Sequence, residues 1–237
     1  GRLILLAGDR DAWFYAVDAD SGEQLWKDKV EKHEWALVTG SPSLYDGLVY
    51  VPVSSFEELA GGSSTYECCT FRGSVVAYDV ETGKRVWKSS TVLEELVKTK
   101  KMANGVQLWG PSGVAVWSQP TIDPKAGVLY VTTGDSYSSP ASATSDAIIA
   151  MDLKTGEIKW YRQTYADDAF TSACVAPNAD PIAQEGCGPD VDYGSSAILR
   201  TLPNGRRILL AGQKSGVLHG LDPDNKGETL WQKQLSP

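Results

Sequence analysis

Short apolar runs in this chain repeatedly end in an aspartate that is followed eight or nine residues later by a tryptophan. The four copies begin at Asp18, Asp79, Asp152 and Asp222, and successive copies lie 61, 73 and 70 residues apart. Each copy passes through Asp-x-x-Ser/Thr-Gly or a close variant, in which the aspartate can bond its own backbone and the glycine permits a positive φ. Four strand–turn–strand repeats are therefore predicted.

The segments around these turns are rich in β-branched and aliphatic residues, which favour strands. The runs are ILLAG (4–8), LVYVPV (48–53), GSVVAYD (73–79), VLYVTTG (128–134), AIIAMD (147–152) and ILLAG (208–212). Each repeat is expected to form an antiparallel sheet of about four strands, as in a propeller blade. The tryptophans Trp26, Trp87, Trp160 and Trp231 would then pack between neighbouring blades. The predicted fold class is an all-β propeller.

One window departs from the strand pattern. In residues 91–102, Val92, Leu93, Leu96 and Val97 fall at helical spacing. We therefore expect a helix there, within a surface insertion at about 91–109. Otherwise residues 1–237 are expected to form a single propeller, or part of one.

Length and charge narrow the classes of function. The 237 residues can bury a sizeable core, and 22 basic against 30 acidic residues give a formal charge of −8. An acidic chain is a poor partner for nucleic acid, and no apolar run is long enough to span a membrane. No signal peptide is visible, so the chain is expected to be a mature product or, in our interpretation, a piece of something longer.

Four cysteines allow three pairings. We favour Cys68–Cys69 and Cys174–Cys187, of which the second would tie a loop at about 166–190. Disulfides form in oxidising compartments, so the predicted location is periplasmic or extracellular. Four reduced cysteines remain the alternative. A zinc site is disfavoured because only two histidines occur and no CxxC pair exists.

Several segments are not explained by blade packing. They are VTGSP (38–42), VSSFEEL (53–59), ECCTFRG (67–73), GPSGVAVWSQPTIDPKAGVLYVTTGDSYSSP (110–140), PDVDYGSS (189–196) and AGQKSG (211–216). In this combination and order the chain resembles the quinoprotein alcohol dehydrogenases, which use pyrroloquinoline quinone (PQQ), and above all their polyvinyl alcohol dehydrogenase-like branch. The resemblance runs along essentially the whole chain but covers about half of that family's eight-bladed propeller.

The resemblance implies a set of residues that contact the cofactor. Trp117 matches the tryptophan that lies flat on one face of the quinone, and a Cys68–Cys69 disulfide would cover the other face, although the pair stands at an unusual place in the chain. Arg72 could pair with a quinone carboxylate. The remaining matches are Thr39 and Ser55, for the cofactor's carboxylates, and Lys214, for the quinone oxygens.

The resemblance also implies a metal ion and a catalytic base. Glu58 and Asp135 match ligands of Ca²⁺, which prefers oxygen donors. Asp192 matches the catalytic aspartate and a further metal contact. Glu57 and Asp190 are the alternatives if the register is shifted. Relatives that use lanthanides carry another aspartate where Gly194 stands here, which favours Ca²⁺.

The implied activity is oxidation of an alcohol, either secondary or polymeric. Asp192 would accept the alcohol proton, Lys214 would stabilise the developing oxyanion, and hydride would pass to the quinone with Ca²⁺ as Lewis acid. Electrons would then go to a cytochrome c. The alternative is a non-catalytic propeller, either a scaffold of the outer-membrane assembly type or a binding module for sugars or peptides. Further blades, from the same or another chain, are the other expected partner.

Overall fold

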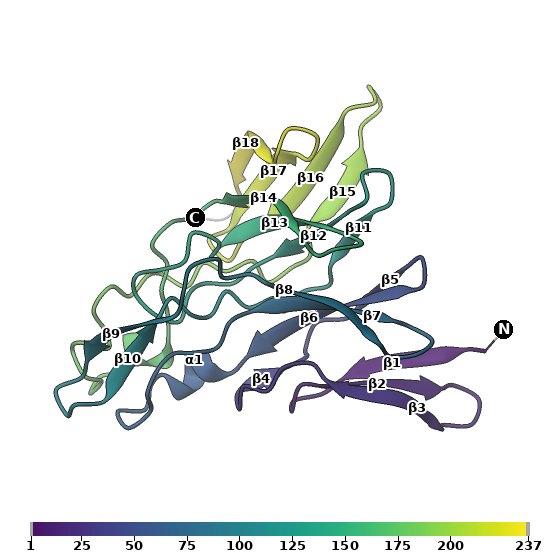
Figure 1. Cartoon of the computed structure of the whole chain (residues 1–237). Helices are drawn as coiled ribbons and strands as arrows, with labels where there is room; N and C mark the ends of the chain where they lie inside the picture. Colours follow the sequence, from purple (N-terminus) through teal and green to yellow (C-terminus); the bar gives the residue numbers. More distant parts are fainter. Residues whose placement is uncertain (1, 236–237) are drawn as a thin grey trace.

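In the computed structural model, which describes residues 2–235, four antiparallel sheets follow one another in an arc (Figure 1). Blade 1 contains β1 (Ile4–Gly8), β2 (Trp13–Asp18) and β3 (Gln24–Lys29). Blade 2 contains β4 (Ala36–Leu37), β5 (Ser43–Tyr45), β6 (Leu48–Ser55), β7 (Ser74–Asp79) and β8 (Arg85–Ser90). Blade 3 contains β11 (Thr121–Asp123), β12 (Val128–Thr132), β13 (Ala147–Asp152) and β14 (Ile158–Gln163). Blade 4 contains β15 (Ile198–Thr201), β16 (Arg207–Gly212), β17 (Val217–Asp222) and β18 (Glu228–Gln234). The predicted propeller architecture is confirmed.

The cores lie between the blades because successive side chains of a strand point to opposite faces of its sheet. In β7, Val76 and Tyr78 pack toward blade 1, whereas Val75 and Ala77 pack toward blade 3. All four side chains are fully buried. This is why the central strands read as nearly continuous apolar runs.

The repeated turns join the blades. The first three repeat tryptophans each lie over the turn glycine of the next repeat, so that a Cβ atom built on Gly83, Gly156 or Gly227 would lie 2.5–2.6 Å from an indole atom. The indole nitrogen of Trp26 donates to the Val80 carbonyl at 2.9 Å, and that of Trp87 donates to the Leu153 carbonyl at 3.1 Å. The predicted packing role of these tryptophans is confirmed for the three junctions between the described blades.

The predicted helix at 91–102 is wrong. This segment contains β9 (Val97–Lys101), which pairs with β10 (Gln107–Gly110) in a hairpin. Val92 is buried, but Leu93 and Val97 are each 51% exposed, so the apolar positions do not share one face. Asn104 and Gly105 lie in the hairpin turn, and an Asn-Gly pair is a common hairpin signal that the helical spacing obscured.

Helical structure is sparse and lies beside this hairpin. Within the described residues it consists of α1 (Glu57–Ala60) and a 3-10 helix at Ser172–Cys174. Within residues 2–235, no helix has the length and apolar character needed to cross a bilayer. The hairpin, α1 and the loop at 166–190 gather at the same end of the blades (Figure 1).

Candidate functional site

A cavity of about 260 Å³ lies where segments at the ends of the blade strands meet. Seven of the residues predicted from the sequence line it: Thr39, Ser55, Glu58, Trp117, Asp135, Asp192 and Lys214. They come from six separate stretches of chain, from the β4–β5 connection to the turn between β16 and β17. The fold therefore brings together residues up to 175 positions apart, because Thr39 and Lys214 both reach one space.

Backbone hydrogen bonds between the blades hold these stretches in place. The Val116 amide donates to the Val53 carbonyl at 3.1 Å, and the Gly134 amide donates to the Ala115 carbonyl at 3.0 Å. The Lys214 amide donates to the Asp192 carbonyl at 2.9 Å. The cavity walls are thus cross-linked through the main chain, so the side chains project from fixed points.

Among the acids that line the cavity, Asp192 has both a backbone hydrogen bond and an ion pair. Its Oδ1 accepts a hydrogen bond from the Asp135 amide, and its Oδ2 pairs with Lys214 Nζ at 2.8 Å. A Cβ atom on residue 134 would lie 2.8 Å from Oδ1, so Gly134 is what allows the carboxylate to approach this backbone. Lys214 Nζ also pairs with Asp190 Oδ1 at 2.5 Å, so one ammonium group is shared between the two aspartates.

The acids of the cavity exceed its single ammonium group. Burial, together with Asp192 and Asp190, raises the pKa of Glu58 to about 7, although Lys214 opposes the shift. Burial, with Asp192 and Glu58 next, raises the pKa of Asp135 well above its usual range. Burial alone would lower the pKa of Lys214, but its bonds to Asp190 and Asp192 raise it on balance. Because these carboxylates repel one another, the site favours the binding of a cation.

Asp135 has a carboxylate oxygen that is free to bind such a cation. Its Oδ2 is buried and has no hydrogen-bond partner within residues 2–235. Glu58, Asp135 and Asp192 present only oxygen donors, which suit a hard cation such as Ca²⁺. Across the described part of the chain, no group of three His, Cys, Asp or Glu side chains is arranged to hold a metal ion by itself. The residues fit a cation that takes further oxygen ligands from a bound molecule.

Trp117 forms a flat wall of the cavity. Lys214 Nζ lies 5.7 Å from its ring centroid, and a Cβ on Gly194 would lie 3.0 Å from its Cη2. Unlike Trp26, Trp87 and Trp160, Trp117 covers no turn glycine of the described chain. A planar ring system can stack on such an indole, and the glycine at 194 gives the indole its space.

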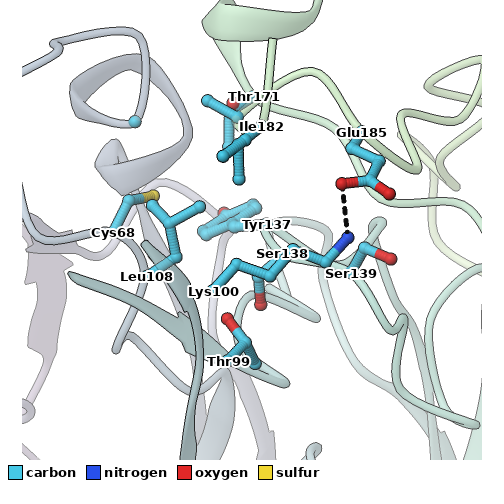
Figure 2. A pocket seen from close by; sticks show the side chains of 12 residues that line it. Cys68, Thr99, Lys100, Leu108, Tyr137, Ser138, Ser139, Thr171, Ile182 and Glu185 are labelled. Carbon is cyan, nitrogen blue, oxygen red and sulfur yellow. Dashed lines mark ion pairs between the residues drawn. The ribbon is translucent and has the colours of Figure 1, made fainter. Parts of the chain in front are cut away.

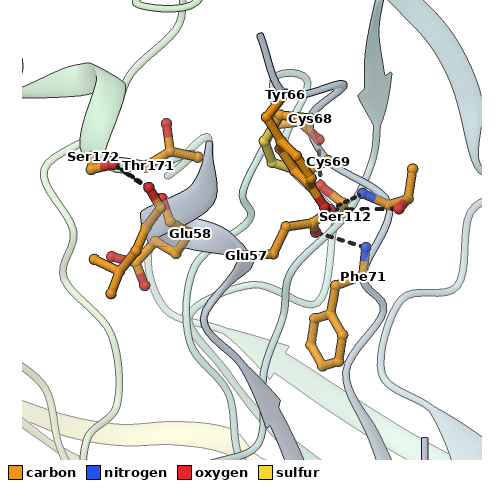
Figure 3. Close-up of a disulfide and its surroundings, with 12 residues drawn as sticks. Glu57, Glu58, Tyr66, Cys68, Cys69, Phe71, Ser112, Thr171 and Ser172 are labelled. Carbon is orange, nitrogen blue, oxygen red and sulfur yellow. Dashed lines mark hydrogen bonds between the residues drawn. A yellow bond between two sulfur atoms is a disulfide. The ribbon is translucent and has the colours of Figure 1, made fainter. Parts of the chain in front are cut away.

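The two predicted disulfides are present, but the first lies outside the cavity lining. Cys174 and Cys187 are joined with an S–S distance of 2.00 Å, and Cys68 is joined to its neighbour Cys69 through a cis peptide (Figure 3). Cys68 lines an adjacent hollow instead (Figure 2). Cys68 and Cys69 belong to the apolar cluster against which Trp117 packs.

Arg72 also lies outside the lining. Its Nη2 donates to the carbonyls of Val92 at 2.9 Å and Glu94 at 2.5 Å. The guanidinium therefore secures the segment that leads into β9. Its Nη1 is buried without a partner in the described chain.

The structure distinguishes the two neighbouring glutamates. Glu57 Oε1 accepts the Thr70 amide, and Oε2 accepts the Phe71 amide, each at 2.7 Å (Figure 3). Its carboxylate is fully buried and holds the loop that carries the Cys68–Cys69 pair. Glu58 lines the cavity, so the register that assigns the predicted ligand to Glu58 agrees with the geometry.

Two residues of this region were not singled out from the sequence. Tyr137 lines the cavity and donates to the Ser55 carbonyl at 3.4 Å. Tyr137 stands two positions after Asp135 in a segment already noted as unusual. Residues two apart in an extended segment share a face, and this spacing could have indicated Tyr137 from the sequence. Asp146 is fully buried, and neither of its carboxylate oxygens has a partner within residues 2–235. No motif marks Asp146 in the sequence.

Comparison with known proteins places this geometry in a family. Residues 60–172 match the family described as "PQQ: Glucose/ethanol/alcohol dehydrogenase, beta-propeller domain". A polyvinylalcohol dehydrogenase from a Pseudomonas species is 41% identical over 222 residues, which cover 94% of this chain and 34% of the relative. The structure of the quinohemoprotein alcohol dehydrogenase ADHIIG from Pseudomonas putida matches 99% of this chain and 33% of its own, with a TM-score of 0.72 and 25% identity.

Another solved structure matches less well. BamB from Moraxella catarrhalis aligns with a TM-score of 0.52 and 15% identity, over 98% of this chain and 47% of its own, which shows a shared fold alone. The chain spans about a third of the length of the curated dehydrogenase relatives it matches. This chain, a partial propeller, belongs to the PQQ-dependent quinoprotein alcohol dehydrogenase family.

Proposed function

We propose that this chain contributes the cofactor cavity of a PQQ-dependent dehydrogenase that oxidises an alcohol. The observation that carries the proposal is the convergence of Trp117, Glu58, Asp135, Asp192 and Lys214 on one space. A propeller that serves only as a scaffold has no use for three clustered acids and one lysine at the ends of its blades. The relatives' names point to the same activity.

The residues of the cavity divide the work of binding. Trp117 offers its ring to a planar cofactor, and the hydroxyls of Thr39 and Ser55 provide small polar contacts on the blade 2 side. Glu58, Asp135 and Asp192 would hold Ca²⁺ together with oxygen atoms of the cofactor. When bound, PQQ would supply a hydride acceptor, with Ca²⁺ as the Lewis acid beside it.

Asp192 is the proposed general base. Its Oδ2 faces Lys214, and its Oδ1 accepts a hydrogen bond from the Asp135 amide, so the carboxylate is fixed in position. A proton from a substrate hydroxyl would be accepted at this carboxylate. Lys214 would place a positive charge where negative charge develops on the reacting oxygens.

The substrate and the surroundings are inferred more broadly. We propose a secondary alcohol, or a polymer that bears secondary hydroxyls, because of the polyvinylalcohol dehydrogenases among the relatives. A cytochrome c is the proposed electron acceptor. The two disulfides support a periplasmic or extracellular location.

The proposal is tested by loading a protein that contains this chain with PQQ and Ca²⁺. Uptake is followed by quenching of tryptophan fluorescence, and turnover is followed with a redox dye and butan-2-ol. Asp192→Asn keeps one oxygen that can contact Ca²⁺, so it should retain uptake, but it should lower turnover by about 10²–10⁴-fold, the usual contribution of a general base. The control is Asp190→Asn. Asp190 pairs with the same lysine, Lys214, but does not line the cavity.

Two results would overturn the proposal. The first is the absence of PQQ uptake by a sample shown to be folded. The second is an equal loss of turnover in the Asp192 and Asp190 variants.

A further inference from the structure

Tyr137 forms the part of the cavity wall that borders the hollow beside Cys68. It lies in the connection between β12 and β13, two residues after Asp135. Its side chain lines the cavity and also lines the adjacent hollow that contains Cys68 (Figure 2). Tyr137 therefore stands between the two spaces.

The ring of Tyr137 is held in place from several directions. A Cβ atom on Gly113 would lie 2.8 Å from Tyr137 Cδ1, so the ring packs directly over this glycine. The ring of Phe71 lies alongside, with 6.2 Å between the two centroids and 23° between the ring planes. The Tyr137 amide donates to the Ser112 carbonyl at 3.1 Å. Because Tyr137 is buried and fixed by these contacts, its hydroxyl has a defined position.

The hydroxyl of Tyr137 is poorly satisfied for a buried group. Its one hydrogen bond within the described chain, to the Ser55 carbonyl, is 3.4 Å long, whereas O–H···O bonds in proteins are usually about 2.7–2.8 Å. The other four buried tyrosines of the described chain have hydroxyl bonds of 2.8–3.2 Å, namely Tyr50, Tyr78, Tyr130 and Tyr193. A buried donor with so long a bond gains when a ligand in the cavity offers a stronger acceptor.

The charges of the cavity make such a donor useful to an anionic ligand. Glu58, Asp135 and Asp192 present only acceptor oxygens when they are ionised. The ammonium group of Lys214 is already shared between two aspartates. A bound molecule with carboxylates of its own is repelled by ionised acids, so its binding depends on donors that offset this repulsion. A phenol, which is neutral at pH 7, supplies one.

We propose that the phenol O–H of Tyr137 donates to a carboxylate oxygen of PQQ on the side of the cavity where Ser55 lies. The inference rests on the proposed PQQ-dependent function and adds a residue to its cofactor site. Ser55 is itself predicted to contact the cofactor's carboxylates, and its carbonyl lies 3.4 Å from the Tyr137 hydroxyl. The phenol exchanges a long bond to a neutral carbonyl for a bond to a charged oxygen, and bonds of the second kind are shorter and stronger.

The test compares the PQQ affinity of the unsubstituted protein with that of Tyr137→Phe, which removes only the hydroxyl. PQQ is titrated, with Ca²⁺ present, into a protein that contains this chain, and quenching of tryptophan fluorescence gives the Kd. The variant loses a hydrogen bond to a charged group, so it should bind PQQ about 10- to 100-fold more weakly. The measurement requires neither turnover nor an electron acceptor.

The matched control is Tyr50→Phe. Tyr50 is also buried, and its hydroxyl donates to a backbone carbonyl, that of Leu153, at 3.2 Å. Because Tyr50 does not line the cavity, its variant should bind PQQ as tightly as the unsubstituted protein. Urea unfolding without PQQ separates binding from folding. Tyr137→Phe should unfold at nearly the same urea concentration as the unsubstituted protein, because the bond that it removes is long.

Three results would overturn this contact: equal PQQ affinity in Tyr137→Phe and the unsubstituted protein, equal weakening by Tyr50→Phe, or a large loss of stability in Tyr137→Phe without PQQ. If the folded, unsubstituted protein takes up no PQQ, the proposed function fails and the contact fails with it. If PQQ is taken up and Tyr137→Phe binds it unchanged, the contact alone fails.

Discussion

The outer turns and the inner cavity of this molecule satisfy their polar groups very differently. In the outer turns, Asp18, Asp79 and Asp152 each accept the amide three residues ahead at 2.8–3.0 Å, and a tryptophan covers the turn glycine of the next blade. In the cavity and just behind it, Asp135 and Asp146 carry buried oxygens that have no partner within the described chain.

The difference separates what builds the propeller from what the propeller holds. The hydrogen bonds of the repeated turns contribute stability. Buried acids without partners reduce it, and such groups persist where a ligand or a reaction needs them. Three changes would break or sharpen this contrast.

The largest effect on stability is expected from Trp87→Ala. Trp87 is 9% exposed, lies 5.8 Å from the ring of Tyr50, and donates to the Leu153 carbonyl across the blade 2–blade 3 junction. Loss of a buried tryptophan costs about 3–5 kcal/mol, which urea unfolding would measure. Trp231→Ala, at a tryptophan that is 38% exposed here, is the control and should cost much less. Similar losses in the two variants would contradict the assignment of Trp87 to the junction.

A smaller effect is expected from Gly156→Ala. Gly156 has a φ of +73°, and a Cβ there would lie 2.5 Å from Trp87 Cε3. The left-handed backbone costs about 1–2 kcal/mol for alanine, and the clash adds about 1–3 kcal/mol. Gly127→Ala shares the positive φ, +66°, but its Cβ would meet nothing within 4 Å, so it isolates the backbone cost. Equal melting temperatures for the two variants would show that the Trp87 indole does not require a residue without a side chain at position 156.

The smallest effect concerns Asp146, on the other side of the comparison. Burial, then Asp168 and Asp192, raises the pKa of Asp146 to about 8. The folded state thus holds a proton that the unfolded state releases near pH 4, so this acid should lower stability as pH rises from about 4 to about 8. Asp146→Asn removes this dependence and fits the positive φ of 50°, since Asn tolerates that region.

The measurement is urea unfolding of both proteins at pH 5 and pH 8. The Asn variant should be the more stable at pH 8 by on the order of 2 kcal/mol, and the two should be similar at pH 5. An unchanged difference between the two pH values would contradict a titrating Asp146.

The sequence allowed the fold to be predicted where local chemistry repeats. Four Asp-to-Trp turns mark four blades, and the strands around them have continuous apolar runs because both faces of each sheet are covered. The hairpin at 97–110 was missed, since Val92 and Leu96 satisfied helical spacing while the decisive Asn104–Gly105 turn lay just beyond the window.

The cavity could be predicted only through the resemblance. Nothing in the spacing of Glu58, Asp135 and Asp192 indicates that they meet, because their approach depends on how whole blades are placed. Cys68, Cys69 and Arg72 illustrate the limit of that route. Their segment matches the family, yet Arg72 donates to backbone carbonyls and neither cysteine lines the cavity, so their predicted contacts with the cofactor stay predictions. Asp146 carries no local signal, since its burial is a tertiary property.

The way each tryptophan reaches forward has a consequence for how such a protein can grow. At every junction between described blades, the indole comes from the earlier blade and the receiving glycine turn comes from the later one. A blade therefore carries one half of two different joints. A tandem duplication of a blade would add both a tryptophan and a glycine turn that fit the neighbouring blades, so the number of blades can change without a new kind of contact.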